Sequence, residues 1–243
     1  MIFTSGTTMS INTLAFGYGK KHLHKGDEII LTESEHASNV LPWYKIAKET
    51  GAEIRFIELD EEGKITLQNL KKILNSHTKI VALACISNVL GYEINLKNFA
   101  KEIHKFNAIF AVDGAQSVPH IKTDFKDSDI DFLSFSGHKM CGPTGIGCLI
   151  GKYKLLEDMD SFITGGGMNI TFNKQIMCEE VNPPRRFEAG TLPLDQIMGL
   201  TAAINYILNV GIENITNHEI ELRKYAISEM KKNPNIIIYN EYY

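Results

Sequence analysis

Short apolar runs alternate with amphipathic segments along the chain as far as residue 151. Runs rich in Ile, Val and Phe predict strands, and apolar positions spaced three or four apart predict helices. The predicted strands are 27–32, 52–59, 79–86, 108–113, 131–136 and 146–151. The predicted helices are 9–17, 38–51, 66–75 and 95–107. Strands that alternate with helices indicate an α/β protein with a mainly parallel sheet flanked by helices.

The pattern changes beyond Gly151. Segment 164–193 is rich in glycine and proline and has little periodicity, so we predict an extended loop with a functional or interface role. Two helices are predicted next, at 194–211 and 212–233. The final apolar run, 233–243, is expected to be the first strand of an unfinished unit.

Composition narrows the class of protein. A hydrophobic fraction of 44% and a charged fraction of 22% are typical of a globular protein, and no apolar run is long enough to span a membrane. The net charge of −4 and the scattered lysines disfavour nucleic acid as a partner. The start of the chain shows no secretory signal pattern, so we expect a cytoplasmic protein.

The cysteines indicate neither disulfides nor a metal site. Cys85, Cys141, Cys148 and Cys178 include no CxxC pair, which favours reduced thiols. His138, Cys141 and Cys148 could be considered as zinc ligands, but a fourth ligand is missing and the spacing fits no common site. We therefore expect no metal.

Polar residues cluster directly after three of the predicted strands. These groups are Ser87-Asn88, Asp113 to Gln116, and Ser136 to Lys139. Ligands of open α/β sheets bind at the carboxyl ends of the strands. We therefore expect the three groups to converge on one ligand.

Lys139 and Asp113 together suggest a particular cofactor. A lysine held at a strand end can lose its proton and form a Schiff base with a carbonyl, although a lone loop lysine is usually only a surface residue. Asp113 ends a predicted buried strand and needs a cationic partner there, unless it merely caps the turn at Gly114. A lysine Schiff base with an aspartate at the ring nitrogen is the signature of pyridoxal phosphate enzymes.

The same cofactor requires a phosphate site. Gly6-Thr7-Thr8 precedes the first predicted helix, where backbone N–H groups and the helix dipole favour an anion, although threonine is also a common helix cap. Ser136 and His138 add donors beside the lysine. His36, beyond the strand 27–32, could stack on a flat ring or be an ordinary loop histidine.

Six motifs, taken together, resemble those of a known family. In order and spacing, "SGTT", "EHASNVLPW", "SNVLG", "DGAQSVPH", "SFSGHKMCGPTGIG" and "RRFEAGT" resemble the SUF-type cysteine desulfurases, also called cysteine desulfurase/selenocysteine lyase. The resemblance is continuous from Ile2 to about Gly211. It implies the large domain of a fold-type-I pyridoxal phosphate transferase of the class-V aminotransferase group, and a homodimer.

The resemblance also implies roles for the matching residues. Lys139 would bond to the cofactor and carry the proton, and Asp113 would face the pyridine nitrogen. His36 would stack on the ring, and Gln116 would lie near the phenolic oxygen. The residues implied to hold the phosphate are Thr7, Thr8, Ser136 and His138.

Two further roles concern the substrate and the dimer. Asn88 would lie by the substrate carboxylate and the ring, and Thr191 would reach the phosphate of the partner subunit's cofactor. The implied reaction converts L-cysteine, or L-selenocysteine, to alanine and passes sulfur to an acceptor protein, in the service of iron–sulfur cluster assembly.

The family's persulfide cysteine and its carboxylate-binding arginine belong to a carboxy-terminal domain beyond Tyr243. We therefore expect a fold truncated at both ends, with residues 1–211 as a partial cofactor-binding domain and 212–243 as the start of an incomplete small domain. None of the four cysteines matches the persulfide position.

Alternatives remain open at this point. The Lys–Asp–His core is shared by other class-V enzymes, such as a selenocysteine lyase, an epimerase-like enzyme or an aminotransferase. A catalytically silent fragment that only dimerises or binds a partner is also compatible with the sequence.

Overall fold

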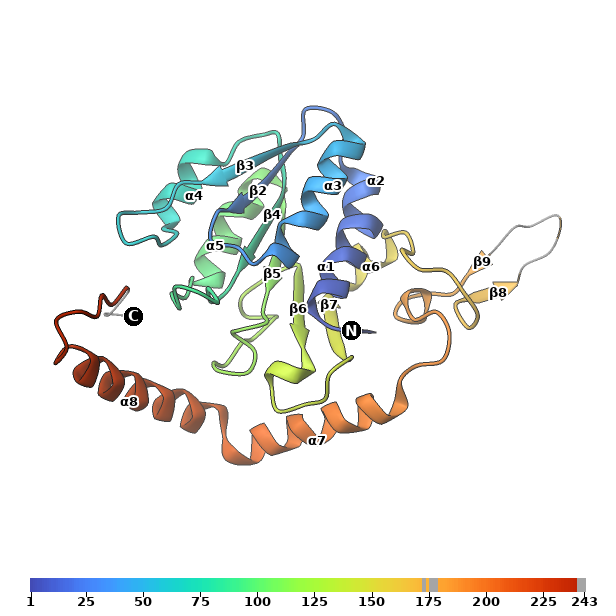
Figure 1. The fold of residues 1–243 in the computed structure, drawn as a ribbon. Coiled ribbons are helices and arrows are strands. Elements are labelled where there is room, and N and C mark those ends of the chain that lie inside the picture. Colours follow the sequence, from blue (N-terminus) through green and yellow to red (C-terminus); the bar gives the residue numbers. More distant parts are fainter. Residues whose placement is uncertain (172–173, 175–178, 240–243) are drawn as a thin grey trace.

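A seven-stranded sheet forms the centre of the protein in the computed structural model, which describes residues 1–171, 174 and 179–239 (Figure 1). From edge to edge the strands are β1 (Ile2–Thr4), β7 (Gly147–Gly151), β6 (Phe132–Ser136), β5 (Ile109–Asp113), β4 (Thr78–Ala84), β2 (Glu28–Thr32) and β3 (Glu53–Ile57). Neighbouring strands from β6 to β3 are parallel, and β7 is antiparallel to both β6 and β1. The predicted α/β class with a mainly parallel sheet is confirmed.

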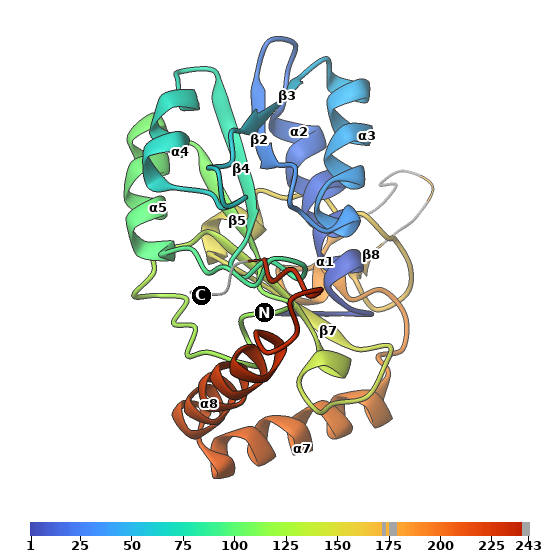
Figure 2. The same cartoon turned by 60° about the vertical axis from the view of Figure 1, so that its left-hand side comes forward.

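Helices cover both faces of the sheet (Figure 2). One face carries α1 (Thr7–Leu14), the wide π-helical turn Ala15–Gly19, α2 (Lys20–His22), α3 (Leu41–Thr50) and α6 (Tyr153–Glu157). The other face carries α4 (Leu67–Ile73) and α5 (Leu96–Ile103), which continues into the 3-10 turn His104–Phe106. Each face has its own apolar core, with Trp43 and Phe132 in the first and Leu70 and Phe110 in the second. Burial on both faces explains why the central strands read as continuous apolar runs.

Local signals fix several helix ends. Thr66 Oγ1 accepts the Asn69 N–H at 3.1 Å, and Asn95 Oδ1 accepts the Asn98 N–H at 2.9 Å, so both residues cap their helices. Gly51 ends α3 in the left-handed conformation, with φ of 80°. These ends agree with the predicted boundaries to within a few residues.

The carboxy-terminal part contains two long helices joined at Gly211. They are α7 (Leu194–Val210) and α8 (Ile212–Met230), which pass below the carboxyl ends of β5 and β6 in Figure 1. α7 buries Leu200, Ala203 and Ile207, and of these Leu200 and Ile207 belong to the core on the α4–α5 face. α8 buries no side chain fully. The division of the chain at residue 211 remains a prediction.

Thr216 and Glu219 attach α8 to the rest of the protein. Thr216 Oγ1 donates to the His120 carbonyl at 2.6 Å, and Glu219 Oε1 lies 2.8 Å from His120 Nδ1. Both contacts reach the segment that follows β5. They hold α8 beside the carboxyl ends of the strands.

The first helix differs from its predicted bounds of 9–17. It begins at Thr7, because Gly6 supplies the turn into the helix with φ of 145°. Helical conformation does not stop at Gly17 but continues through the π-helical turn and α2 to His22, and a Cβ at Gly17 would lie 2.6 Å from the Asp160 carbonyl oxygen. Gly17 therefore serves close packing against the segment after α6 rather than termination.

The strand predicted at 233–243 is wrong over the described residues. Up to Tyr239 the chain forms turns and irregular structure, and residues 240–243 lie outside the described part. The Ile237 and Tyr239 side chains are 76% and 77% exposed. An apolar run becomes a strand only where it pairs with a sheet edge, and the described residues of this run pair with no strand of either sheet.

The segment 164–193 contains more structure than the predicted loop. β8 (Asn169–Thr171) pairs with β9 (Glu179–Glu180), and a 3-10 turn covers Arg185–Phe187. Residues 172–173 and 175–178, including Cys178, lie outside the described part. Over the described residues, we find no helix that is both long enough and apolar enough to cross a membrane.

Candidate active site

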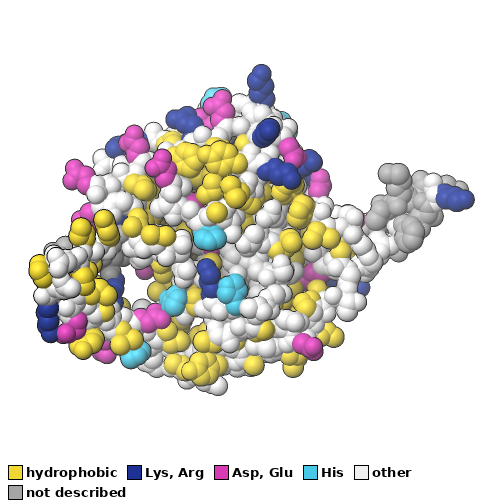
Figure 3. Space-filling view, viewed as in Figure 1, with side chains coloured by type: hydrophobic (Ala, Val, Ile, Leu, Met, Phe, Trp, Pro, Cys, Tyr) yellow, Lys and Arg dark blue, Asp and Glu magenta, His cyan; other side chains and the backbone are white. Residues whose placement is uncertain are grey.

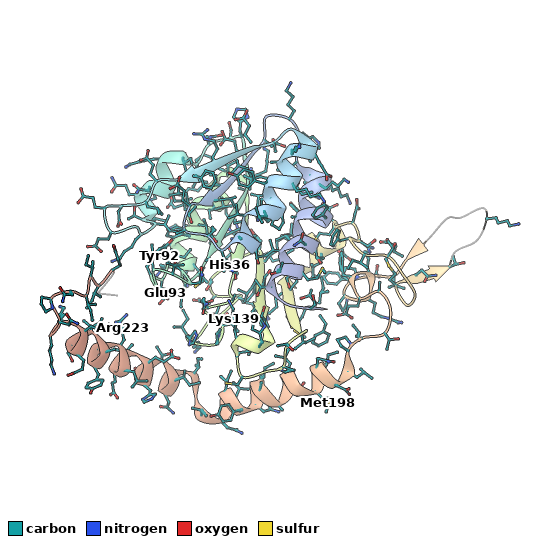
Figure 4. The ribbon with its side chains drawn as sticks, in the orientation of Figure 1. His36, Tyr92, Glu93, Lys139, Met198 and Arg223 are labelled. Atoms are coloured by element: carbon teal, nitrogen blue, oxygen red, sulfur yellow. The ribbon has the colours of Figure 1, made fainter. Side chains whose placement is uncertain are left out.

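A cavity of about 190 Å³ opens at the carboxyl ends of β4, β5 and β6. In the space-filling view, histidine side chains surround a cationic side chain at the centre of this face, and the labelled view identifies His36 and Lys139 there (Figures 3 and 4). Of the residues predicted for the site, those that line the cavity are Thr7, Thr8, His36, Asn88, Asp113, Gln116, Ser136, His138 and Lys139. The structure therefore brings together every predicted site residue except Thr191.

Lys139 lies in a 3-10 turn, Gly137–Lys139, that directly follows β6. The turn is tight, because both Met140 N–H and Gly142 N–H donate to the Gly137 carbonyl at 2.9 Å. A Cβ at Gly137 would lie 2.8 Å from Ile146 Cγ2, so glycine is needed at this position. The backbone thereby presents the half-buried Lys139 side chain to the cavity.

Asp113 ends β5 and is only 6% exposed. Burial raises the pKa of this carboxyl group, while the Ala115 N–H and electrostatic interactions with Lys139 and His36 act to lower the pKa. The Ala115 N–H donates to Oδ1 at 2.9 Å. Because its ionised form depends on positive charge in the cavity, Asp113 is suited to face a cation there.

The amino end of α1 forms the opposite wall. Ser136 Oγ accepts the Thr7 N–H at 2.8 Å and lies 2.7 Å from Thr7 Oγ1. A Cβ at Gly147 would lie 2.5 Å from Gly6 Cα and 2.4 Å from the Phe135 carbonyl oxygen, so this close approach requires glycine. Backbone N–H groups and hydroxyls at a helix start favour an anion.

His36 precedes the 3-10 turn Ala37–Asn39, between β2 and α3. Its Nδ1 accepts the Ser38 N–H at 3.1 Å, so a neutral ring carries its proton on Nε2. Ser38 Oγ in turn lies 2.7 Å from Thr8 Oγ1. This turn therefore connects His36 to the first turn of α1.

Sequence reasoning missed Ser38 and Glu35. Ser38 lines the cavity, and Glu35 accepts hydrogen bonds directly beneath the His36 turn. Burial raises the pKa of Glu35 to about 7, and the Asp113 charge adds to the rise. In the sequence, only their positions on either side of His36 indicated a role in the site, because a sequence does not show which way a loop side chain turns.

Thr191 lies outside the cavity described above. It is exposed and lines a different cavity of about 230 Å³, together with Phe3, Met9, Phe162 and Leu192. Its predicted role toward a partner subunit's cofactor therefore rests on the resemblance alone.

A wider cavity adjoins the first. It measures about 530 Å³ and shares Ile86, Asn88 and Gln116 with the first cavity. Its far wall is α8, from which Glu219 and Arg223 line it. In Figure 4, Arg223 on α8 and Glu93 lie to one side of the region that holds His36 and Lys139.

The mainly parallel sheet carries lysine, aspartate and histidine side chains at its carboxyl edge, an arrangement typical of α/β enzymes. The comparison with family models then identifies the family. The sequence matches the aminotransferase class-V family over residues 1–242, and the chain belongs to this family. Among curated proteins it is 46% identical to a probable cysteine desulfurase of Staphylococcus epidermidis over 239 residues, which is 98% of this chain and 58% of the relative. A probable cysteine desulfurase of Staphylococcus aureus is 44% identical with the same coverage.

Solved structures give the same result. The cysteine desulfurase CsdA from Escherichia coli is similar with a TM-score of 0.93 and 35% identity, over 96% of this chain and 58% of that one. A cysteine desulfurase from Thermococcus onnurineus gives 0.88 and 34%, over 95% of this chain and 58% of that one. The resemblance to cysteine desulfurases and the predicted fold are confirmed, while the SUF-type subdivision remains a prediction. The chain spans 58% of the length of these relatives.

Proposed function

We propose that this chain is the pyridoxal phosphate-binding part of a cysteine desulfurase. The observation that carries the proposal is that Lys139, Asp113 and His36 line one cavity whose opposite wall is the start of a helix. The names of the relatives, as cysteine desulfurases, support L-cysteine as the substrate.

The residues present fit the cofactor. The buried Asp113 needs a cation, which a protonated pyridine nitrogen provides. The phosphate would be held by Thr7, Thr8, Ser136 and His138, where N–H and hydroxyl donors surround a helix start. His36 would stack on the ring, and Gln116 would lie near the phenolic oxygen.

The cofactor supplies an electron sink that makes the α-hydrogen of a bound amino acid acidic. In this chain Lys139 Nζ would hold the cofactor and then take the α-proton, while Asp113 keeps its negative charge at the ring nitrogen. Asn88 would orient the substrate carboxylate. A thiolate would form an S–S bond with the sulfur of L-cysteine while the Cβ–S bond breaks, which gives a persulfide, and protonation of Cβ and Cα would then give alanine.

The described cysteines are poor candidates for that thiolate. Burial raises the pKa of Cys85 to about 12 and that of Cys148 to about 11, so both thiols are protonated at neutral pH. Cys141 is exposed and matches no persulfide position of the family. We infer that the sulfur passes to a thiol outside the described residues. This thiol would lie in an acceptor protein or elsewhere in a homodimer. In that homodimer, Thr191 would contribute to the partner subunit's site.

Absorbance and product analysis test the proposal. The purified chain with pyridoxal phosphate should turn yellow, Lys139→Ala should abolish the colour, and L-cysteine with a reductant should yield alanine and sulfide. A coloured protein that releases no alanine would favour another class-V activity, and L-selenocysteine is the first alternative substrate to compare. A colourless wild type contradicts the proposal and favours a chain that only dimerises or binds a partner.

A further inference from the structure

The Glu35 carboxylate, one residue before His36, joins three elements at the carboxyl end of the sheet. It accepts the Ala84 N–H through both oxygens, at 3.0 and 2.9 Å. It also accepts hydrogen bonds from Asn39 Nδ2 at 2.7 Å and from Thr32 Oγ1 at 3.1 Å. Thr32 closes β2, Ala84 closes β4, and Asn39 ends the turn that follows His36. One half-buried side chain thus ties the His36 turn to two strands.

The surroundings of Glu35 present hydrogen-bond donors to it and so favour an accepting side chain. The Ala84 N–H can only donate. Trp43, which is fully buried, donates its Nε1–H to Asn39 Oδ1 at 3.3 Å, and this contact turns the Asn39 NH₂ group toward Glu35. A glutamine at position 35 would set its own NH₂ group against donors.

Among the described residues, Asp113 and Tyr92 are titratable groups that interact with Glu35, and His36 is its neighbour in sequence. Asp113 is the charged group that acts on it, and raises its pKa together with burial. Ser34 Oγ, which lies 3.0 Å from Thr32 Oγ1, connects the network to Tyr92 OH at 2.5 Å. Burial raises the pKa of Tyr92 to about 12, so this phenol stays neutral. The donors around Glu35 are therefore what favours its ionised form.

The turn that Glu35 holds determines where two cavity residues lie. Asn39 N–H donates to the His36 carbonyl at 2.7 Å, and Ser38 N–H donates to the His36 ring at 3.1 Å. Ser38 also contacts Thr8 at the start of α1. Movement of Asn39 would therefore displace His36 and Ser38 together.

We propose that Glu35 is a positioning residue for His36. Its carboxylate fixes the turn Ala37–Asn39 against the ends of β2 and β4, so that the His36 ring stays over the cofactor cavity. The inference rests on the proposed function, since that function gives His36 its role on the cofactor ring. A carboxylate that merely stabilised the fold would not act through His36.

Asp131 provides a matched control for a purely structural role. It is a buried carboxylate that, like Glu35, accepts a strand N–H, here from Phe110 at 2.7 Å, and it pairs with His104 and Lys152. It lies at the opposite, amino end of β5 and β6. Asp131→Asn therefore disturbs a comparable network far from the cavity.

The first experiment uses the full chain without cofactor. Backbone hydrogen exchange is compared in the wild type, Glu35→Gln and Asp131→Asn. Loss of a charge-assisted hydrogen bond should raise exchange at Ala84, Asn39 and Val40 about tenfold in Glu35→Gln. Asp131→Asn should leave these amides unchanged. Equal protection of the His36 turn in the wild type and Glu35→Gln would overturn the inference; if that variant does not fold, Glu35→Asp is used, since its shorter side chain cannot reach both strands.

The second experiment is a double-mutant cycle with pyridoxal phosphate as the probe. Glu35→Gln should weaken pyridoxal phosphate binding about tenfold and shift the visible spectrum of the bound cofactor. In the His36→Ala background the same change should cost less than about twofold, because the residue it acts through is gone. Fully additive effects would show that Glu35 acts independently of His36, and the inference would be wrong. A wild type that binds no cofactor would refute the proposed function instead, and hydrogen exchange alone would then decide the role of Glu35.

Discussion

Asp113 shows how a residue can serve function at the expense of stability. Its carboxyl group is buried, and burial raises its pKa because the negative charge is poorly solvated. A group whose pKa is raised on folding binds protons more tightly in the folded state. The contribution of Asp113 to stability therefore falls as the pH rises from 3.8, the ordinary pKa of an aspartate, through the raised pKa of the folded state. A protonated ring nitrogen in the cavity would offset this cost.

We predict that Asp113→Asn separates the two effects. The asparagine keeps an acceptor for the Ala115 N–H but carries no charge. The cofactor-free variant should be at least as stable as the wild type at pH 7 by thermal unfolding. Its turnover of L-cysteine to alanine should fall by about 100-fold or more, because one electrostatic contact to the reacting system is lost. Turnover close to that of the wild type would remove Asp113 from the ring nitrogen.

The sequence alone predicts that Lys139, Asp113 and His36 lie at the same edge of the sheet. All three stand at or just beyond the ends of predicted strands, and the carboxyl ends of parallel strands meet. The sequence could not reveal Glu35. That side chain is recognisable only from its four hydrogen bonds, which depend on how the turn after β2 folds back on β4. Long-range contacts of loop side chains are not encoded in any local periodicity.

At the scale of elements, β7 fits beside β6 and the start of α1 only because Gly147 has no side chain. Its backbone lies against Phe135 and Gly6, and Gly6 opens the helix that faces the cavity. The fit of this strand therefore sets both the sheet edge and the proposed phosphate site.

We predict that Gly147→Ala destabilises the protein by about 1–3 kcal/mol, because the added Cβ must push β6 and Gly6 apart. Gly166→Ala is the matched control, since a Cβ there meets nothing within 4 Å, and it should change stability by less than about 0.5 kcal/mol. Urea unfolding of both variants gives the comparison. Similar stability in the two variants would mean that β7 can shift without cost.

Helices and strands with a long hydrophobic pattern could be predicted from the sequence. Strands that form only by pairing with another strand could not. β1 has three residues, too few to show a period, and forms because the β7 edge is available to Ile2–Thr4. The run 236–239 is as apolar as a strand but pairs with no strand of either sheet. Pairing, rather than local sequence, decided both outcomes.

At the scale of the whole molecule, the two ends of the sheet have different roles. The carboxyl end forms the cavity, and the amino end carries a charge cluster. There Asp131 pairs with His104 Nε2 and with Lys152 Nζ, each at 2.8 Å, and Asp129 pairs with the same two partners. The hydrogen bond to Asp131 raises the pKa of His104, against burial and Lys152. The same pairs lower the pKa of Asp131 despite its burial.

These shifts fix the sign of a pH dependence. Because the pKa of His104 is raised above 6.5 on folding, its contribution to stability is complete below pH 6.5 and is lost as the pH rises through the folded value. The contributions of Asp129 and Asp131, whose pKa values are lowered, are present above 3.8 and are lost only in acid. Burial also raises the pKa of Glu35, to about 7, so the wild-type curve alone cannot assign the loss to His104.

His104→Gln resolves that overlap, because glutamine keeps a donor for Asp131 but cannot be charged. We predict that the wild type exceeds this variant by about 1 kcal/mol in free energy of unfolding at pH 6, and that the difference shrinks toward pH 9. Urea unfolding across this range measures it, and Glu35 cancels in the difference because both proteins contain it. A difference that grew with pH would mean that His104 is neutral in the folded protein. A pH-independent difference would assign it to packing, and the amino-end cluster would then stabilise the sheet without sensing pH.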